Sequence, residues 1–121
     1  MTDYTKMDNE ELSAAVAERL FGWELVRLKT NLGIMIRFKD AKGGLRTYTD
    51  HRFSECRNAC AEAEAEMERR GLKLKYTDAL LNLLADRGWF ADEDDLWMVR
   101  HAPPNMCCRA MLTVLDEEDA G

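Results

Sequence analysis

The stretch GWELVRLKTNLGIMIRFK, residues 22–39, has the pattern of a β-hairpin. It holds two strand-like runs, 23–29 and 33–39, separated by Thr30-Asn31-Leu32, a spacing that suits a β-hairpin. The second run alternates with a period of two, which assigns Ile34, Ile36 and Phe38 to one face and Met35, Arg37 and Lys39 to the other. We therefore predict two antiparallel strands, with the isoleucine and phenylalanine face in the core and the other face in water.

Further strands are predicted on the C-terminal side of this hairpin. Residues 40–44 form a turn rich in glycine, and residues 45–48 read as a third short antiparallel strand. The clean alternation of residues 72–76 predicts an edge or near-edge strand, and residues 96–100 predict a last one. The expected sheet therefore has about four to five strands and is mostly antiparallel.

Helices are predicted on both sides of the hairpin in the sequence. A capping box from Asp8 to Glu11 starts a helix over 9–21, and Gly22 ends it. Apolar residues three and four apart predict a second helix over 53–70, whereas residues 77–87 fit a short helix or a buried strand. A long helix follows Pro103-Pro104 and buries Met106, Cys107, Ala110, Met111, Val114 and Leu115.

These elements predict an α+β fold, with the sheet flanked by helices in an α/β/α sandwich-like arrangement. A length of 121 residues is typical of one domain, which we expect over residues 1–115, followed by an acidic flexible tail over 116–121. Hydrophobic residues make up 46% and charged residues 33%, which is typical of a soluble globular domain. The apolar runs are far too short to cross a bilayer and the first residues do not resemble a signal peptide, so we expect a cytoplasmic protein without a membrane partner.

Charge is distributed unevenly along the chain, although the total is −6. Residues 27–75 contain 12 Lys/Arg and 7 Asp/Glu, a net charge of +5, whereas the remainder contains 5 basic and 16 acidic residues, a net charge of −11. The acidic total argues against direct nucleic-acid binding, since such proteins need positive charge to contact phosphates.

The cysteines and histidines do not form a recognisable catalytic or metal motif. Cys56, Cys60, Cys107 and Cys108 lack a Cys-x-x-Cys knuckle and fall at helical spacings with apolar residues, so we interpret them as buried reduced thiols rather than zinc ligands with His51 or His101. No nucleophile elbow, P-loop or dinucleotide fingerprint is present. We therefore expect no enzymatic activity, metal or cofactor.

Residues 14–23 (AAVAERLFGW) and 102–110 (APPNMCCRA) resemble two helices of small phage and prophage proteins with a so-called ABA sandwich. The first segment is similar to their opening helix, which ends in Gly-Trp before a sheet. The second is similar to their closing helix, which is entered through a proline and carries a Cys-Arg-Ala core. The resemblance implies a sheet flanked by helices and a viral origin, and it provides no catalytic residues; residues 77–88 depart from the pattern as an extra element.

Two stretches are candidate contact surfaces. The acidic run 92–95 lies between aromatic residues, which are frequent beside charge at interfaces, so we predict a protein-binding surface of Asp92, Glu93, Asp94, Asp95, Trp89 and Trp97. The basic hairpin offers a site for a phosphate-bearing ligand, for which we single out Arg37, Lys39, Arg46 and Tyr48. Its alternative interpretation is a solvated sheet face whose charges guard against aggregation.

These observations favour a small, non-enzymatic, phage-type protein that binds a host protein stoichiometrically and antagonises a host defence system. A protein that sequesters a small ligand or nucleotide with the basic hairpin is the alternative. A homodimer, formed through the strand over 72–76 or through the helix faces, remains open.

Overall fold

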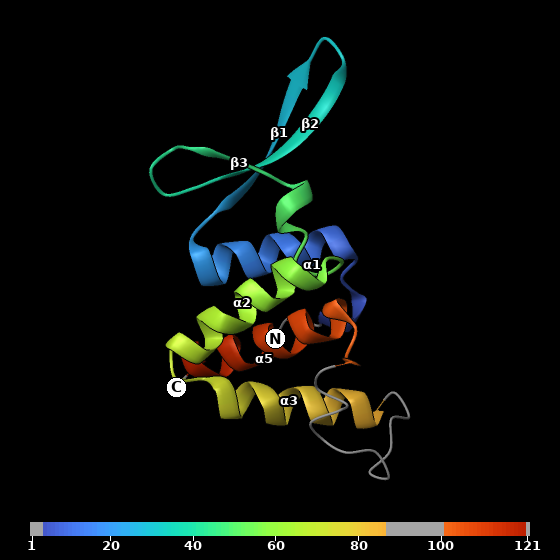
Figure 1. Ribbon diagram of the computed structural model, residues 1–121, viewed down its shortest axis with the longest axis vertical. Helices are drawn as coiled ribbons and strands as arrows, with labels where there is room; N and C mark the ends of the chain where they lie inside the picture. The colour runs from blue at the N-terminus through green and yellow to red at the C-terminus, as the bar shows by residue number, and fades with distance from the viewer. Residues whose placement is uncertain (1–3, 87–100, 121) are drawn as a thin grey trace.

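The computed structural model describes residues 4–86 and 101–120 and has an α+β fold, as predicted. Its helices are α1 (Asn9–Val16), α2 (Arg57–Arg69), α3 (Lys73–Asp86) and α5 (Pro104–Ala120). Its strands are β1 (Glu24–Thr30), β2 (Gly33–Lys39) and β3 (Leu45–Thr47). In Figure 1 the helices pack together and the β1–β2 hairpin extends away from them.

The predicted start and end of the first helix are confirmed in atomic detail. The Asp8 side chain accepts a hydrogen bond from the Glu11 backbone N–H at 2.8 Å, and the Glu11 side chain accepts from the Asp8 backbone N–H at 3.4 Å. The last turn, Ala17–Phe21, widens into a π-helical turn, η2. Gly22 then adopts φ 70°, the left-handed conformation that lets the chain leave the helix for β1.

The sheet is antiparallel in the order β1-β2-β3. Thr30 pairs with Gly33 across the hairpin turn, and the register continues to Glu24 opposite Lys39. The hairpin and the short third strand confirm the predicted boundaries to within one residue. The expected sheet of four to five strands and its sandwich are not confirmed, because the described residues form three strands and the predicted strand over 96–100 lies outside them.

The hydrophobic core lies between the helices, with α5 at its centre. α5 packs against α1, α2 and α3 and is buried on nearly all sides. Its buried residues include all six that the sequence predicted, together with Cys108, Arg109 and Leu112. The Arg109 guanidinium also ties the N-terminal segment to α5, since Nε donates to the Tyr4 carbonyl oxygen at 3.1 Å and Nη2 to that of Met7 at 3.4 Å.

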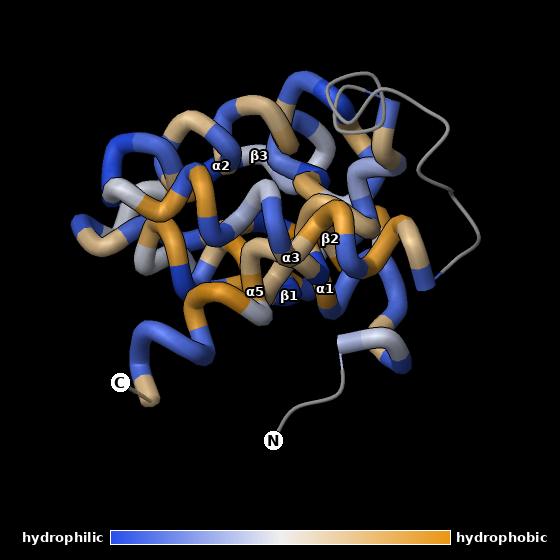
Figure 2. Tube along the Cα trace, turned by 90° about the horizontal axis from the view of Figure 1, so that it is seen from below, coloured by the Kyte–Doolittle hydropathy of each residue, from blue (hydrophilic) through white to orange (hydrophobic). Residues whose placement is uncertain are grey.

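The strand predicted over residues 72–76 was wrong, because Lys73–Asp86 is one continuous helix, α3. The alternation of leucine and lysine there also fits a helix, in which Tyr76, Leu80 and Leu84 recur every fourth residue and are buried. Figure 2 shows hydrophilic and hydrophobic residues alternating along this helix, as expected for one that packs one face against α5. The helical alternative for residues 77–87 is confirmed as far as Asp86.

Residues 116–120, which composition assigns to an acidic flexible tail, form the last part of α5. Asp116 and Asp119 hold the two terminal nitrogens of Arg19 at 2.6 and 2.5 Å, and Glu118 forms an ion pair with Lys75. The acidic residues at the end of α5 are thus paired with Arg19 and Lys75 from other segments, although such partly exposed ion pairs each contribute only about 0–1 kcal/mol. The second predicted helix begins later than expected, at Arg57 rather than Phe53.

Among the described residues, no helix combines the length and the apolar character that crossing a bilayer requires.

Candidate protein-binding hairpin

The outer half of the β1–β2 hairpin presents four large apolar side chains to solvent. The exposed fraction is 98% for Leu32, 67% for Ile34, and 37% for both Leu28 and Met35. Leu32 lies in the turn. Leu28 pairs with Met35, two residue pairs away from the Thr30–Gly33 pair that flanks the turn. We call these four residues the apolar tip; it lies at the end of the hairpin that is farthest from the helices in Figure 1.

The exposure of Ile34 corrects the prediction that Ile34, Ile36 and Phe38 together face the core. Phe38 is fully buried, Ile36 is half-buried and Ile34 is exposed. The three share a face, as the period of two predicts, but burial decreases toward the turn. The reason is that the described helices cover only the base of the hairpin, so its outer residues have no described element to pack against.

An aromatic cluster joins the base of the hairpin to the helices. The Trp23 ring centroid lies 4.8 Å from that of Phe21, 5.0 Å from His51, 6.0 Å from Phe38 and 6.3 Å from Phe53. Such ring pairs add roughly 0.5–1.5 kcal/mol each beyond the burial of their area. The cluster therefore packs the base of the hairpin against the helices, and the outer half projects beyond it (Figure 1).

The sheet register separates the predicted ligand-binding residues. Arg37 pairs with Thr47 and Lys39 with Leu45, so these two basic side chains share one face. Arg46 pairs with Phe38 and therefore lies on the opposite face, where its guanidinium covers the Trp23 ring. Tyr48 is half-buried, with its ring centroid 5.6 Å from that of Phe38. The four residues do not converge on one pocket.

The turn after β2 is organised by Asp40. Its Oδ1 accepts hydrogen bonds from the backbone N–H of Gly44 at 2.8 Å and of Lys42 at 3.0 Å, and Nε of Arg46 lies 3.4 Å from Oδ2. The N–H of Gly44, followed by that of Lys42 and the Arg46 charge, lowers the pKa of Asp40. Arg46 is thus engaged by Asp40 and Trp23, which favours a structural role for it over the predicted contact with a phosphate.

The predicted acidic surface of Asp92, Glu93, Asp94, Asp95, Trp89 and Trp97 lies outside the described residues.

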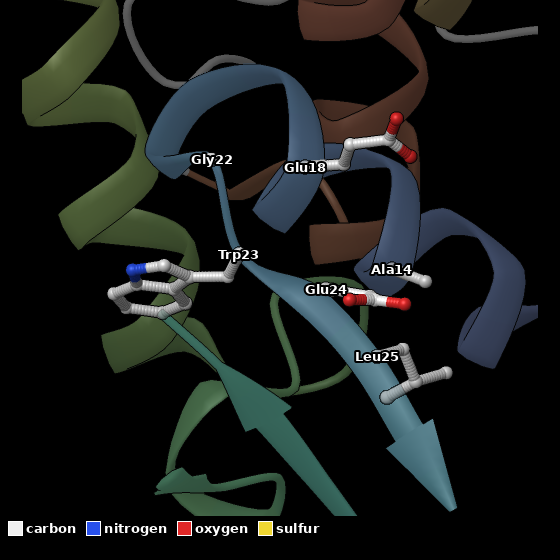
Figure 3. A pocket seen from close by; sticks show the side chains of 6 residues that line it. All are labelled: Ala14, Glu18, Gly22, Trp23, Glu24 and Leu25. Atoms are coloured by element: carbon white, nitrogen blue, oxygen red, sulfur yellow. The ribbon is translucent and has the colours of Figure 1, made fainter. Parts of the chain in front are cut away.

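A groove of about 520 Å³ runs between α1 and the start of β1, as Figure 3 shows. It is lined by Ala14, Glu18, Gly22, Trp23, Glu24 and Leu25. Farther along the same two elements, the Arg27 guanidinium forms an ion pair with Glu10. Glu10, Ala14 and Glu18 are spaced four apart, so one stripe of the first helix faces β1 along this groove.

The four thiols are free, and three of them lie in the core between α2 and α5. Cys60, Cys107 and Cys108 are fully buried, whereas Cys56 is half-buried. The hydrogen bond to Cys107 and burial raise the pKa of Cys60, and burial raises that of Cys108. Within residues 4–86 and 101–120, no three His, Cys, Asp or Glu side chains gather in a geometry that would hold a metal ion.

The apolar tip was missed by sequence reasoning, and one signal pointed to it. Leu32 occupies a turn position, where polar residues and glycine are usual, so an exposed leucine there is not explained by the turn itself.

Comparison with known proteins finds no family model, no characterised protein and no solved structure that matches this chain.

Proposed function

We propose that this chain is a non-enzymatic binding protein that contacts another protein stoichiometrically, and that the apolar tip of its hairpin is the contact surface. The observation that carries this proposal is the exposure of Leu28, Leu32, Ile34 and Met35 on a projecting arm. Leu28 and Met35 share one face of the hairpin, Ile34 lies on the other and Leu32 is in the turn, so a partner that covers all four encloses the end of the hairpin. Apolar side chains that lie close together on a surface mark interaction sites more often than single exposed ones do. Burying one leucine or isoleucine in a partner contributes roughly 1.5–3 kcal/mol.

The charge around the apolar tip favours a partner with an acidic surface. Lys29 on β1 and Arg37 on β2 place positive charge beside the tip, whereas the charge of Arg27 is paired with that of Glu10. Opposite charge on the partner steers association and excludes basic competitors. The resemblance to phage proteins implies a host protein as this partner, and we propose a component of a host defence system. The acidic residues 92–95, with Trp89 and Trp97, remain a proposed second contact.

Affinity purification from the natural host tests the proposal with a matched pair of variants. Leu32→Asp changes the tip, whereas Leu74→Asp makes the same change on α3, where the side chain is 80% exposed. We expect the wild type and Leu74→Asp to retain one partner that Leu32→Asp loses, with unchanged circular dichroism in all three. A partner retained equally by both variants would place the contact elsewhere and refute the role of the tip.

The alternative, sequestration of a small ligand or nucleotide, rests on Arg37 and Lys39, which share a face of the sheet. It has less support, because Arg46 lies on the opposite face. A ligand that binds the folded state raises the melting temperature by mass action, so screening nucleotides for a thermal shift tests this function. A shift that Lys39→Glu abolishes would favour it over protein binding.

A further inference from the structure

The outer edge of β1 is not paired with any strand among the described residues. β1 is seven residues long and stands at the end of the order β1-β2-β3. In an antiparallel pair, every second residue directs its N–H and C=O away from its neighbour, so this edge presents a row of backbone donors and acceptors. Such an edge accepts another strand when the side chains on the two strands are compatible.

Charge along this edge changes sign from one end to the other. The beginning of β1 is acidic, with Glu24 on the strand and Glu18 on the facing helical turn, and both line the groove of Figure 3. The end of β1 is basic and carries Arg27 and Lys29. Parallel addition of an identical strand sets like charges together, whereas antiparallel addition brings each basic end to an acidic one.

We propose that the protein forms a two-fold symmetric homodimer in which the β1 strands of two copies pair antiparallel along this edge. A two-fold axis perpendicular to the sheet keeps residues of the same parity opposite each other. One such register sets Leu25 opposite Lys29 of the second copy and Val26 opposite Leu28 of the second copy. The two-fold symmetry repeats both pairs, so each favourable contact occurs twice in the dimer.

In this register, the direction of the Arg27 side chain indicates which side of the sheet Lys29 of the second copy faces. Arg27, Leu25 and Lys29 alternate with the even-numbered residues and so share one face of β1, and the ion pair of Arg27 with Glu10 shows that this face looks toward α1. Lys29 of the second copy, opposite Leu25, then enters the groove beside Glu18. The two Arg27 side chains meet at the axis, where each keeps the Glu10 of its own chain.

A second copy fits this edge better than an unrelated strand does. Each copy supplies both signs of charge, with Lys29 on β1 and Glu18 on the helical turn before it, and the apolar residues Val26 and Leu28 of the two copies face each other on the outer side. The pairing uses Leu28 and Lys29 and leaves Leu32, Ile34 and Met35 uncovered, so the end of the hairpin stays available to another protein and the homodimer goes beyond the proposed function.

Charge reversal at Glu18 and Lys29 tests the homodimer with the full chain. Multi-angle light scattering should give about twice the monomer mass of 13.9 kDa for the wild type. Lys29→Glu and Glu18→Lys should each raise the dissociation constant about tenfold or more, because each sets like charges together twice. An equimolar mixture of the two variants should dimerise again, since both contacts of the mixed pair then join opposite charges.

Lys42→Glu is the matched control, because Lys42 is an exposed residue of the turn after β2 and lies away from the β1 edge. It should dimerise like the wild type, and circular dichroism should show that all variants fold. A wild type that stays monomeric at millimolar concentration would overturn the proposal. A dimer that survives both single reversals, or a mixture that fails to restore it, would overturn it equally.

Discussion

The guanidinium carbon of Arg46 lies 4.7 Å from the centroid of the Trp23 ring. Arg46 belongs to β3 and Trp23 precedes β1, so this contact joins the two ends of the sheet segment over the aromatic cluster. The same guanidinium forms an ion pair with Asp40, with Nε 3.4 Å from Oδ2. The Arg46 side chain thus links β3 and the turn after β2 to Trp23, and these contacts help to hold the base of the projecting hairpin in place.

Replacing this cation tests its contribution to stability. Arg46→Met keeps the length of the side chain and removes its charge, so we expect a loss of roughly 0.5–1 kcal/mol, the value of an exposed cation–π contact. Unfolding in urea, followed by tryptophan fluorescence, measures the difference. Lys42→Met makes a similar change in the neighbouring turn and should leave the stability unchanged; equal effects of both substitutions would contradict the role of the Trp23 contact.

Ser13 and Ser54 form a buried polar contact between α1 and the segment before α2. The Ser13 hydroxyl oxygen accepts from the Ser54 backbone N–H at 3.1 Å, and the two hydroxyl oxygens lie 2.8 Å apart. Ser13→Ala leaves this N–H without its acceptor in a buried place, which costs about 1–3 kcal/mol in unfolding free energy. Ser54→Ala keeps this N–H bonded but removes the hydroxyl that donates to the Asn9 carbonyl oxygen at 2.5 Å, so it should also destabilise the fold. Urea unfolding measures both variants, and a Ser13→Ala protein as stable as the wild type would contradict the assignment.

The pH dependence of stability should show the contribution of Asp116. A hydrogen bond from Tyr4, followed by one from Arg19, lowers the pKa of Asp116 below its normal value of 3.8. A carboxyl group whose pKa falls on folding stabilises the folded state above its unfolded pKa, and this stabilisation is lost as the pH falls through the folded pKa. Because the side chain is 35% exposed, we expect no more than about 1 kcal/mol.

Asp116→Asn removes this titration. We expect the variant to be less stable than the wild type at pH 7, with the difference in unfolding free energy closing as the pH approaches about 2. Thermal unfolding across this range measures both proteins. Arg19→Gln should reduce the effect of the Asp116 substitution, since it removes a main partner. A difference that persists unchanged at pH 2 would show that a packing change, rather than the charge, is responsible.

The four thiols should differ in reactivity by their burial. Cys56 is half-buried, whereas Cys60, Cys107 and Cys108 are fully buried, so we expect one fast and three slow reactions with an aromatic disulfide reagent. Cys56→Ser should remove the fast phase and leave the slow ones. A fast phase that survives this substitution would mean that a core thiol is accessible in the native state.

Local signals in the sequence were sufficient for the elements that depend on neighbouring residues. The capping box at Asp8, the end of the first helix at Gly22 and the hairpin over 23–39 all follow from interactions within a few residues. The alternating residues 72–76 were misjudged because a short run of leucine and lysine satisfies a period of two and a period near four equally well. Its burial against α5 decides between them.

The candidate site was harder to predict, because exposure depends on what packs nearby. Arg37, Lys39 and Arg46 are close in sequence, but the pairing of β2 with β3 sends Arg46 to the opposite face from the other two. Ile34 has the same pattern as Phe38, and only the reach of the helices makes one exposed and the other buried. Likewise, only the tertiary structure brings Arg19 and Lys75, distant in sequence, beside the acidic residues at the end of α5.

The turns, the helix caps and the alternating strands of this chain follow from its amino-acid order, since they depend on local backbone conformation and short-range hydrogen bonds. The place of α5 at the centre of the core, the projection of the hairpin beyond the helices and the exposure of Leu32 and Ile34 follow only from the packing of distant segments. Burial is a property of the assembled molecule, because a side chain leaves water only when distant parts of the chain cover it.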